Sequence, residues 1–122
     1  MTDTSLRDYE CVLSALAGKS GEDIALMTLE GAGALADVFI LVTGNSEVHM
    51  RTLMEAAEEA LEREGRACRS EGEESSNWRL LDAGDVVVHV FSRKGREFYR
   101  LDRLWEDAEI LHYEQTESWG LK

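Results

Sequence analysis

The 122-residue sequence contains no proline and only two cysteines, Cys11 and Cys68. It also lacks low-complexity runs, internal repeats and linker-like stretches, so we expect one domain. Two cysteines are too few for a disulfide scaffold, and no histidine or cysteine lies at metal-ligand spacing. The sequence therefore predicts no zinc site and two reduced thiols, as in a cytoplasmic protein.

Basic residues are also scarce, because 13 Lys and Arg stand against 25 Asp and Glu, for a formal net charge of −12. Phosphate binding requires clustered cations, so no direct sequence-specific contact with nucleic acid is expected. A basic protein surface is the more natural partner. Hydrophobic residues make up 43% of the chain, which is typical of a globular domain and not of a disordered one.

Long hydrophobic runs are absent, and none approaches the roughly 18 apolar residues of a membrane span. The first ten residues, MTDTSLRDYE, carry acids where a signal peptide requires cations and then an apolar segment. We therefore expect a soluble, cytoplasmic protein without a membrane partner.

What the sequence does contain is an alternation of helix and strand patterns. Helices are predicted at residues 4–18, 47–64 (capped by Asn45 or Ser46 and stopped by Gly65) and 101–110. Strands are predicted at residues 24–29, 38–42, 67–69, 77–81 and 86–91, with a charged turn at 93–96. The last two strands form a hairpin, in which Gly84 takes a turn position that favours positive φ.

This order of elements predicts an α/β (α+β) fold in a single domain. We expect a mixed sheet of four or five strands with packed helices over residues 1–110. Residues 111–122 show no periodicity, which predicts a loosely ordered C-terminal tail.

Two groups of residues could carry chemistry. Gly44-Asn45-Ser46 precedes a helix, as phosphate-binding loops do, but it lacks a glycine fingerprint and a P-loop lysine, so a helix cap is favoured. Asp82, Asp85 and His89 could bind Mg²⁺ or transfer protons, yet aspartate is common in turns and His89 shares a face with apolar residues. We therefore expect no catalytic, cofactor or metal site. The alternative is a metal-dependent nucleotidyl or phosphoryl transferase using Asp37, Asp82 and Asp85 near Ser46.

The strand around Trp78 carries large apolar residues on both faces. Trp78 and Leu80 share one face, whereas Arg79 and Leu81 share the other. An exposed tryptophan beside a leucine and a carboxylate has the composition of a binding hot spot, although Trp78 is equally suited to fill a core.

A series of short blocks then follows a recognisable order and spacing. The blocks are residues 36–39, residues 43–46 with His49, Glu71-Gly72, Trp78 with residues 81–89, and Arg96, Tyr99, Leu101, Leu104 and Trp105. Together they resemble the ribosomal silencing factor (Iojap) family over roughly residues 5–108. The block of Trp78 followed by LDAGDVVVH at 81–89 makes this resemblance specific.

The resemblance implies a nucleotidyltransferase-like fold and a non-enzymatic repressor of translation. It implies binding to the large ribosomal subunit through its fourteenth ribosomal protein, steric exclusion of the small subunit, and a homodimer when the protein is free. The partner-binding residues are predicted in the strand of Trp78, its turn and the preceding strand: Trp78, Leu80, Leu81, Asp82, Gly84, Asp85, Glu71 and Gly72. Trp78 and Leu80 are the expected anchors, and the carboxylates the expected rim.

Three positions depart from the family pattern, namely Thr28, Val38 and Ala83. The family usually has an aspartate where this chain has Thr28, an aromatic residue where it has Val38, and often an aromatic residue where it has Ala83. The strands at 67–69 and 77–81 also lack the paired aspartates that two-metal nucleotidyl transfer requires, so the fold resemblance does not carry that activity.

Overall fold

The computed structural model describes residues 9–29, 37–72, 75–100 and 109–113. The elements follow in the order α2 (Glu10–Gly18), β1 (Glu22–Thr28), β2 (Val38–Gly44), α3 (Glu47–Arg63), β3 (Arg69–Glu71), β4 (Trp78–Asp82), β5 (Val86–Ser92), α4 (Arg93–Tyr99) and β6 (Glu109–His112). No helix in the described residues is long and apolar enough to cross a membrane. The predicted α+β domain is confirmed.

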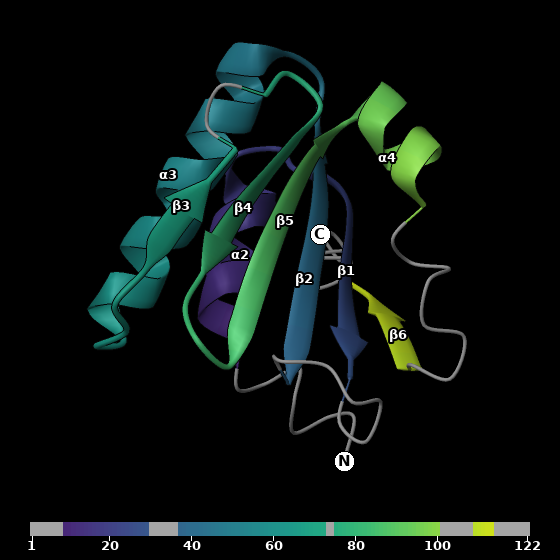
Figure 1. The fold of residues 1–122 in the computed structure, drawn as a ribbon. Helices are drawn as coiled ribbons and strands as arrows, with labels where there is room; N and C mark the ends of the chain where they lie inside the picture. The colour runs from purple at the N-terminus through teal and green to yellow at the C-terminus, as the bar shows by residue number, and fades with distance from the viewer. Residues whose placement is uncertain (1–8, 30–36, 73–74, 101–108, 114–122) are drawn as a thin grey trace, which may run out of the picture.

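The strands form one mixed sheet in the order β3-β4-β5-β2-β1-β6 (Figure 1). The central pair, β2 and β5, is parallel, and the other neighbouring pairs are antiparallel. A parallel pair requires a long crossover, which here contains α3, β3 and β4. The hairpin of β4 and β5 is confirmed, and β3 begins two residues later than predicted.

The sixth strand corrects the prediction of four or five. β6 pairs with β1 through contacts such as Met27 with Ile110. Residues 109 and 110 were predicted to end a helix, and Leu111 and His112 to begin the tail, so both predictions are wrong at these positions. Four residues are too few to show a strand periodicity of their own, and the edge of β1 decides their conformation. The rest of that predicted helix, residues 101–108, and residues 114–122 of the tail lie outside the described residues.

The helix predicted at residues 47–64 is confirmed as α3, which ends one residue earlier, at Arg63. The hydroxyl of Ser46 accepts a hydrogen bond from the backbone N–H of His49 over 3.0 Å, which caps the helix. Gly65 follows the helix with a φ of +82°. Met50 and Met54 on its inner face are buried, as expected for core residues.

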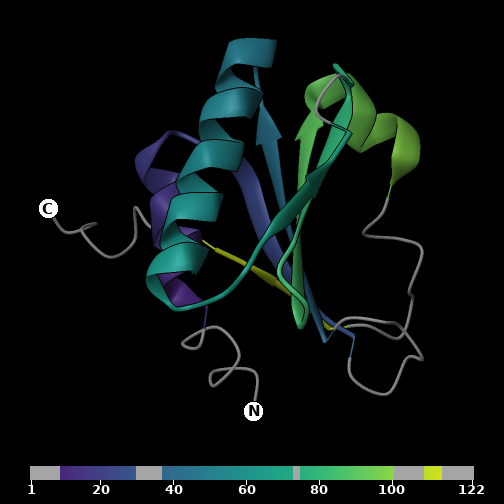
Figure 2. The same cartoon turned by 60° about the vertical axis from the view of Figure 1, so that its left-hand side comes forward.

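The core has two parts because α2 and α3 cover only one face of the sheet (Figure 2). The larger cluster lies beneath these helices and includes Leu13, Leu53, Ile40 and Val88. A smaller cluster occupies the opposite face: Ala25, Met27, Leu29, Leu41 and Phe91, with Phe39, Trp78 and Ile110 packed against them.

The charged turn predicted at residues 93–96 is wrong, because this segment begins α4. The hydroxyl of Ser92 caps the helix by accepting from the backbone N–H of Gly95 over 2.9 Å. Gly95 lies against the backbone of Asn77, whose carbonyl oxygen would be 2.2 Å from a Cβ at this position. A helix this short depends on such packing and carries little signal in the sequence.

Candidate protein-binding face

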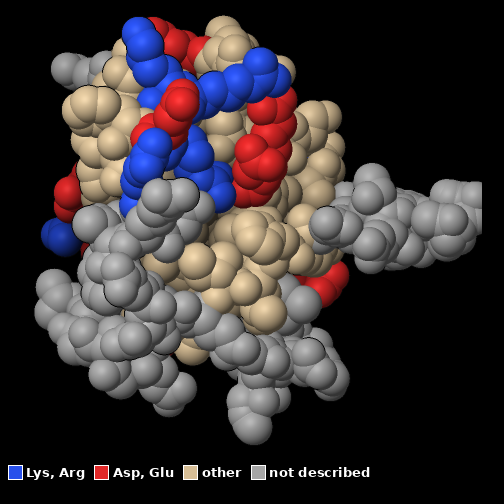
Figure 3. All heavy atoms as spheres, turned by 90° about the vertical axis from the view of Figure 1, so that its right-hand side faces the viewer, with Lys and Arg blue, Asp and Glu red and all other residues tan. Residues whose placement is uncertain are grey.

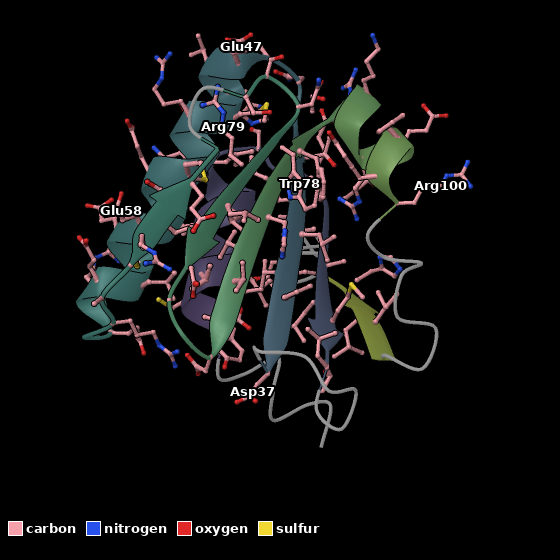
Figure 4. All side chains as sticks on the ribbon, in the orientation of Figure 1. Asp37, Glu47, Glu58, Trp78, Arg79 and Arg100 are labelled. Carbon is pink, nitrogen blue, oxygen red and sulfur yellow. The ribbon has the colours of Figure 1, made fainter. Side chains whose placement is uncertain are left out.

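The residues around Trp78 gather on the face of the sheet that α2 and α3 leave uncovered (Figure 4). Residues opposite each other in the ladder share a face, and the register pairs Leu80 with both Glu71 and His89, and Asp82 with Val87. We call the surface formed by these partly exposed side chains the Trp78 face: Glu71, Trp78, Leu80, Asp82 and Val87. The prediction that Trp78 and Leu80 share one face is confirmed.

Trp78 itself is half-buried, so it is neither a pure core residue nor a free surface residue. Its ring stacks on Phe91 with centroids 5.4 Å apart and lies 4.5 Å from the ring of Tyr99. Its indole N–H donates a hydrogen bond to Nδ1 of His89 over 3.1 Å. The tryptophan is therefore held on three sides while part of it remains accessible.

Beside Trp78, α4 adds exposed aromatic surface that the sequence reasoning missed. Phe98 is 75% exposed and Tyr99 is 40% exposed. With Asn77, Lys94 and Gly95 they line a cavity of about 250 Å³. The two adjacent aromatic residues at 98 and 99 could have indicated this surface from the sequence. Their position depends on α4, however, whose first four residues were predicted as a turn.

Charged side chains cluster at the end of the sheet next to α4 (Figure 3). Here Arg93 donates to both carboxylate oxygens of Glu22, over 2.9 and 2.8 Å. These hydrogen bonds are the main reason that the pKa of the Glu22 carboxyl lies below its ordinary value. The pair is exposed to solvent, so its contribution to stability is small.

Leu81 is not available to a partner, which corrects its place among the predicted binding residues. Its side chain is only 1% exposed and belongs to the core cluster beneath the helices. Arg79, on the same face of β4, is 7% exposed and donates through Nε to the backbone oxygen of Ser75 over 2.8 Å. The alternation along β4 directs both side chains inward.

Asp85 is engaged within the chain. One carboxylate oxygen accepts from the Tyr9 hydroxyl over 2.9 Å, and the other is paired with Arg66. Burial raises the pKa of the Asp85 carboxyl, but the hydrogen bonds from Arg66 and Tyr9 outweigh it, so the pKa lies below its ordinary value. Asp85 thus joins the start of α2, the segment after α3 and the hairpin turn, and we assign it a structural role rather than a rim contact.

The two glycines in the predicted set have backbone roles. Gly84 has a φ of +94°, and its N–H donates to the Asp82 carboxylate over 2.9 Å, which shapes the hairpin turn. Gly72 has a φ of +74°, and a Cβ there would lie 2.9 Å from the backbone oxygen of Trp78. Both positions therefore shape the Trp78 face without presenting a side chain to it.

The expectation that His89 shares a face with apolar residues is confirmed, since it is 4% exposed and its ring packs against those of Phe39, Trp78 and Phe91. Burial lowers the pKa of its imidazole to about 3, so the ring is neutral near pH 7. Nδ1 accepts from Trp78, whereas the buried Nε2 has no hydrogen-bond partner within the described part of the chain. A neutral, buried imidazole is suited to a structural task and not to proton transfer at the surface.

The acidic residues of the alternative transferase site are not brought together with Ser46. Asp37 precedes β2, and Asp82 and Asp85 flank the start of the parallel strand β5, whereas Ser46 follows the far end of β2. Figure 4 shows Asp37 and Glu47, the residue after Ser46, at opposite ends of the sheet. Seven strand residues separate these ends by roughly 23 Å.

The loop after β2 also uses its own hydrogen-bond donors. The backbone N–H of Asn45 donates to Nδ1 of His49 over 2.9 Å, and that of His49 donates to Ser46. Within the described ranges, no group of three or more His, Cys, Asp or Glu side chains is arranged to hold a metal ion. The loop is therefore arranged as a helix cap, as predicted.

Comparison with known proteins points to one family. The model of the family described as ribosomal silencing factor during starvation matches residues 2–120. The ribosomal silencing factor of Halalkalibacterium halodurans is 33% identical, over 86% of this chain and 91% of that protein. That of Bacillus subtilis is 35% identical, over 80% of this chain and 83% of that protein.

More distant and structural matches agree. The mouse protein named mitochondrial assembly of ribosomal large subunit protein 1 is 25% identical, over 80% of this chain and 45% of that protein. A crystal structure of a Chromobacterium violaceum protein superposes with a TM-score of 0.76 at 34% identity, covering 80% of this chain and 82% of that one.

Proposed function

Because this chain belongs to the ribosomal silencing factor family, we propose that it represses translation in the cytoplasm by binding the large ribosomal subunit and preventing the small subunit from joining. The fourteenth ribosomal protein of the large subunit is the partner that the family resemblance implies. The mechanism is steric and requires no chemistry, cofactor or metal ion.

The observation that carries this proposal is the composition of the Trp78 face. A half-exposed tryptophan and leucine lie beside the carboxylates of Glu71 and Asp82, in a chain with a net charge of −12. The apolar centre is flanked by carboxylates on the side of β3 and the hairpin turn, where Glu71 is also paired with Arg69 over 3.9 Å, and that side is complementary to the surface of a basic ribosomal protein. The rim accelerates association, and this effect should weaken with salt because the screening length is about 8 Å at physiological ionic strength.

The binding test is co-sedimentation of Trp78→Ala with purified large subunits, accompanied by a melting curve. Truncating a buried interface tryptophan typically costs at least ~2 kcal/mol, a roughly thirty-fold loss of affinity. Val48→Ala is the matched control, because Val48 is 63% exposed on α3, away from the Trp78 face. A folded Trp78→Ala variant that binds as tightly as Val48→Ala would show that Trp78 is not part of the binding site. Leu80→Ala provides a second variant whose side chain is less involved in the core.

The steric mechanism has its own assay. Added to separated subunits, the parent protein should reduce the amount of joined ribosomes in a sucrose gradient, and Trp78→Ala should not. Binding without any effect on joining would contradict the mechanism and leave only the binding.

The non-enzymatic assignment is supported by the separation of Ser46 from the three aspartates. We expect no Mg²⁺-dependent thermal shift with nucleoside triphosphates. Nucleotide transfer that disappears in Asp82→Ala would refute the assignment. The family resemblance also implies a homodimer when the protein is free, which sedimentation equilibrium of the full chain would detect.

A further inference from the structure

His89 is a polar side chain in an apolar and aromatic environment. Its ring centroid lies 4.4 Å from that of Phe39, 5.9 Å from that of Trp78 and 6.3 Å from that of Phe91. Only 4% of the residue is exposed. An aliphatic side chain could fill this position without desolvating two ring nitrogens, so the packing alone does not explain an imidazole.

The hydrogen bond from Trp78 determines which nitrogen of His89 carries the proton. An indole N–H can only donate, so Nδ1 of His89, 3.1 Å away, must be the unprotonated acceptor. The proton of the neutral ring then resides on Nε2. That atom is buried and has no hydrogen-bond partner among the residues that the structure describes. The tautomer that accepts from Trp78 therefore leaves a buried donor unsatisfied, which lowers the stability of the fold.

We propose that His89 is a positioning residue for Trp78: its hydrogen bond fixes the orientation of the indole on the Trp78 face and so prepares the anchor for the ribosomal partner. This inference rests on the proposed function. A side chain already held in its bound orientation loses less conformational entropy on binding. The backbone of Trp78 is also held, since its N–H donates to the hydroxyl of Ser75 over 3.1 Å.

The first test separates stability from binding. His89→Leu removes both the acceptor for Trp78 and the unsatisfied donor. We expect a melting temperature equal to or above that of the parent, together with a three- to ten-fold weaker affinity for large subunits. A residue needed only for packing would lower the melting temperature. If His89→Leu does not fold, the aromatic variant His89→Phe, which also lacks the acceptor for Trp78, carries the same test.

A double-mutant cycle identifies the hydrogen bond as the cause. Trp78→Phe keeps an aromatic anchor but has no indole N–H. If His89 acts through that N–H, His89→Leu should weaken binding in the parent and have no further effect in the Trp78→Phe background. Equal losses in both backgrounds would overturn the proposal.

A third measurement does not involve the ribosome. The indole N–H signal of Trp78, identified by its absence in Trp78→Phe, should exchange with solvent at least ten-fold faster in His89→Leu than in the parent. An unchanged exchange rate would overturn the proposal.

The binding data distinguish a failure of the proposed function from a failure of the role assigned to His89. A parent protein that fails to co-sediment with large subunits refutes the proposed function and this inference with it. A parent that binds, with His89→Leu binding equally well, refutes this inference alone.

Discussion

Three glycines allow the energetic roles of backbone strain and steric fit to be separated in this fold. A Cβ at Gly84 would have no atom of the described residues within 4 Å, yet the residue has a φ of +94°. Its substitution by alanine therefore introduces backbone strain without a clash. An L-residue in the left-handed region costs roughly 1–2 kcal/mol, so we expect Gly84→Ala to lower the free energy of unfolding by that amount. The β-branched Gly84→Val should cost more, up to about 3 kcal/mol.

Gly18 and Gly95 are the matched controls. A Cβ at Gly18 also has nothing within 4 Å, and the residue ends α2 without a positive φ. Gly18→Ala should therefore raise stability by a few tenths to about 1 kcal/mol. At Gly95 the Cβ would lie 2.2 Å from the backbone oxygen of Asn77. We expect Gly95→Ala to cost at least about 2 kcal/mol, because backbone must move.

The assay is urea unfolding at pH 7, followed by far-UV circular dichroism, with thermal melts as a check. All four glycine variants should change the urea midpoint and not the slope, because the surface exposed on unfolding is unchanged. For a chain of this length, 1 kcal/mol corresponds to roughly 4 °C in melting temperature. If Gly84→Ala is as stable as the parent, or Gly18→Ala loses as much as Gly84→Ala, the assignment of strain to the hairpin turn is refuted.

Two further predictions concern pH. Asp85→Asn should lower the free energy of unfolding at pH 7, because it weakens the interactions with Arg66 and Tyr9. The loss should be only about 1 kcal/mol, since solvent screens this partly exposed carboxylate. Since the folded state lowers the pKa of Asp85 from 3.8, the difference from the parent should shrink as the pH falls below that value; a constant difference in urea titrations would contradict the network. For His89, burial lowers the pKa from 6.5 to about 3, so below pH 6.5 the unfolded chain binds a proton that the folded protein does not, and the fold loses stability progressively as the pH falls towards 3. This loss in the free energy of unfolding reaches up to roughly 5 kcal/mol, so His89→Leu should unfold less readily than the parent at pH 4 to 5. Equal acid sensitivity of the two proteins would show that His89 is not the titrating group.

The helix ends and the hairpin were predictable from the sequence because their signals are local. The cap at Ser46, the stop at Gly65 and the turn at Gly84 depend on residue type and on neighbours a few positions away. The alternation of Trp78 and Leu80 against Arg79 and Leu81 likewise follows from strand geometry alone. These features allowed the hairpin and the shared face of the candidate anchors to be predicted before the fold was known, whereas the family resemblance rested on the ordered blocks, above all Trp78 with residues 81–89.

Other features depended on contacts between distant segments. Asp85 was predicted as a rim residue, but its partner Tyr9 lies 76 positions away in the chain, and no local pattern reveals that hydrogen bond. The burial of Leu81 required knowing which face of β4 the helices cover. The strand β6 and the helix α4 are short, and their existence depends on the edge of β1 and on the close approach of Gly95 to Asn77.

The sequence by itself therefore determined the domain class, the central hairpin, the family and the strand on which the partner-binding surface is proposed, because each rests on spacing along the chain. The tertiary structure alone decided which of the candidate side chains are accessible and which are engaged. It separated Ser46 from the aspartates, assigned Asp85 to an internal network, and placed His89 where its nitrogen accepts from Trp78. Accessibility and hydrogen bonding of this kind depend on the packing of elements far apart in the chain, which residue spacing does not encode.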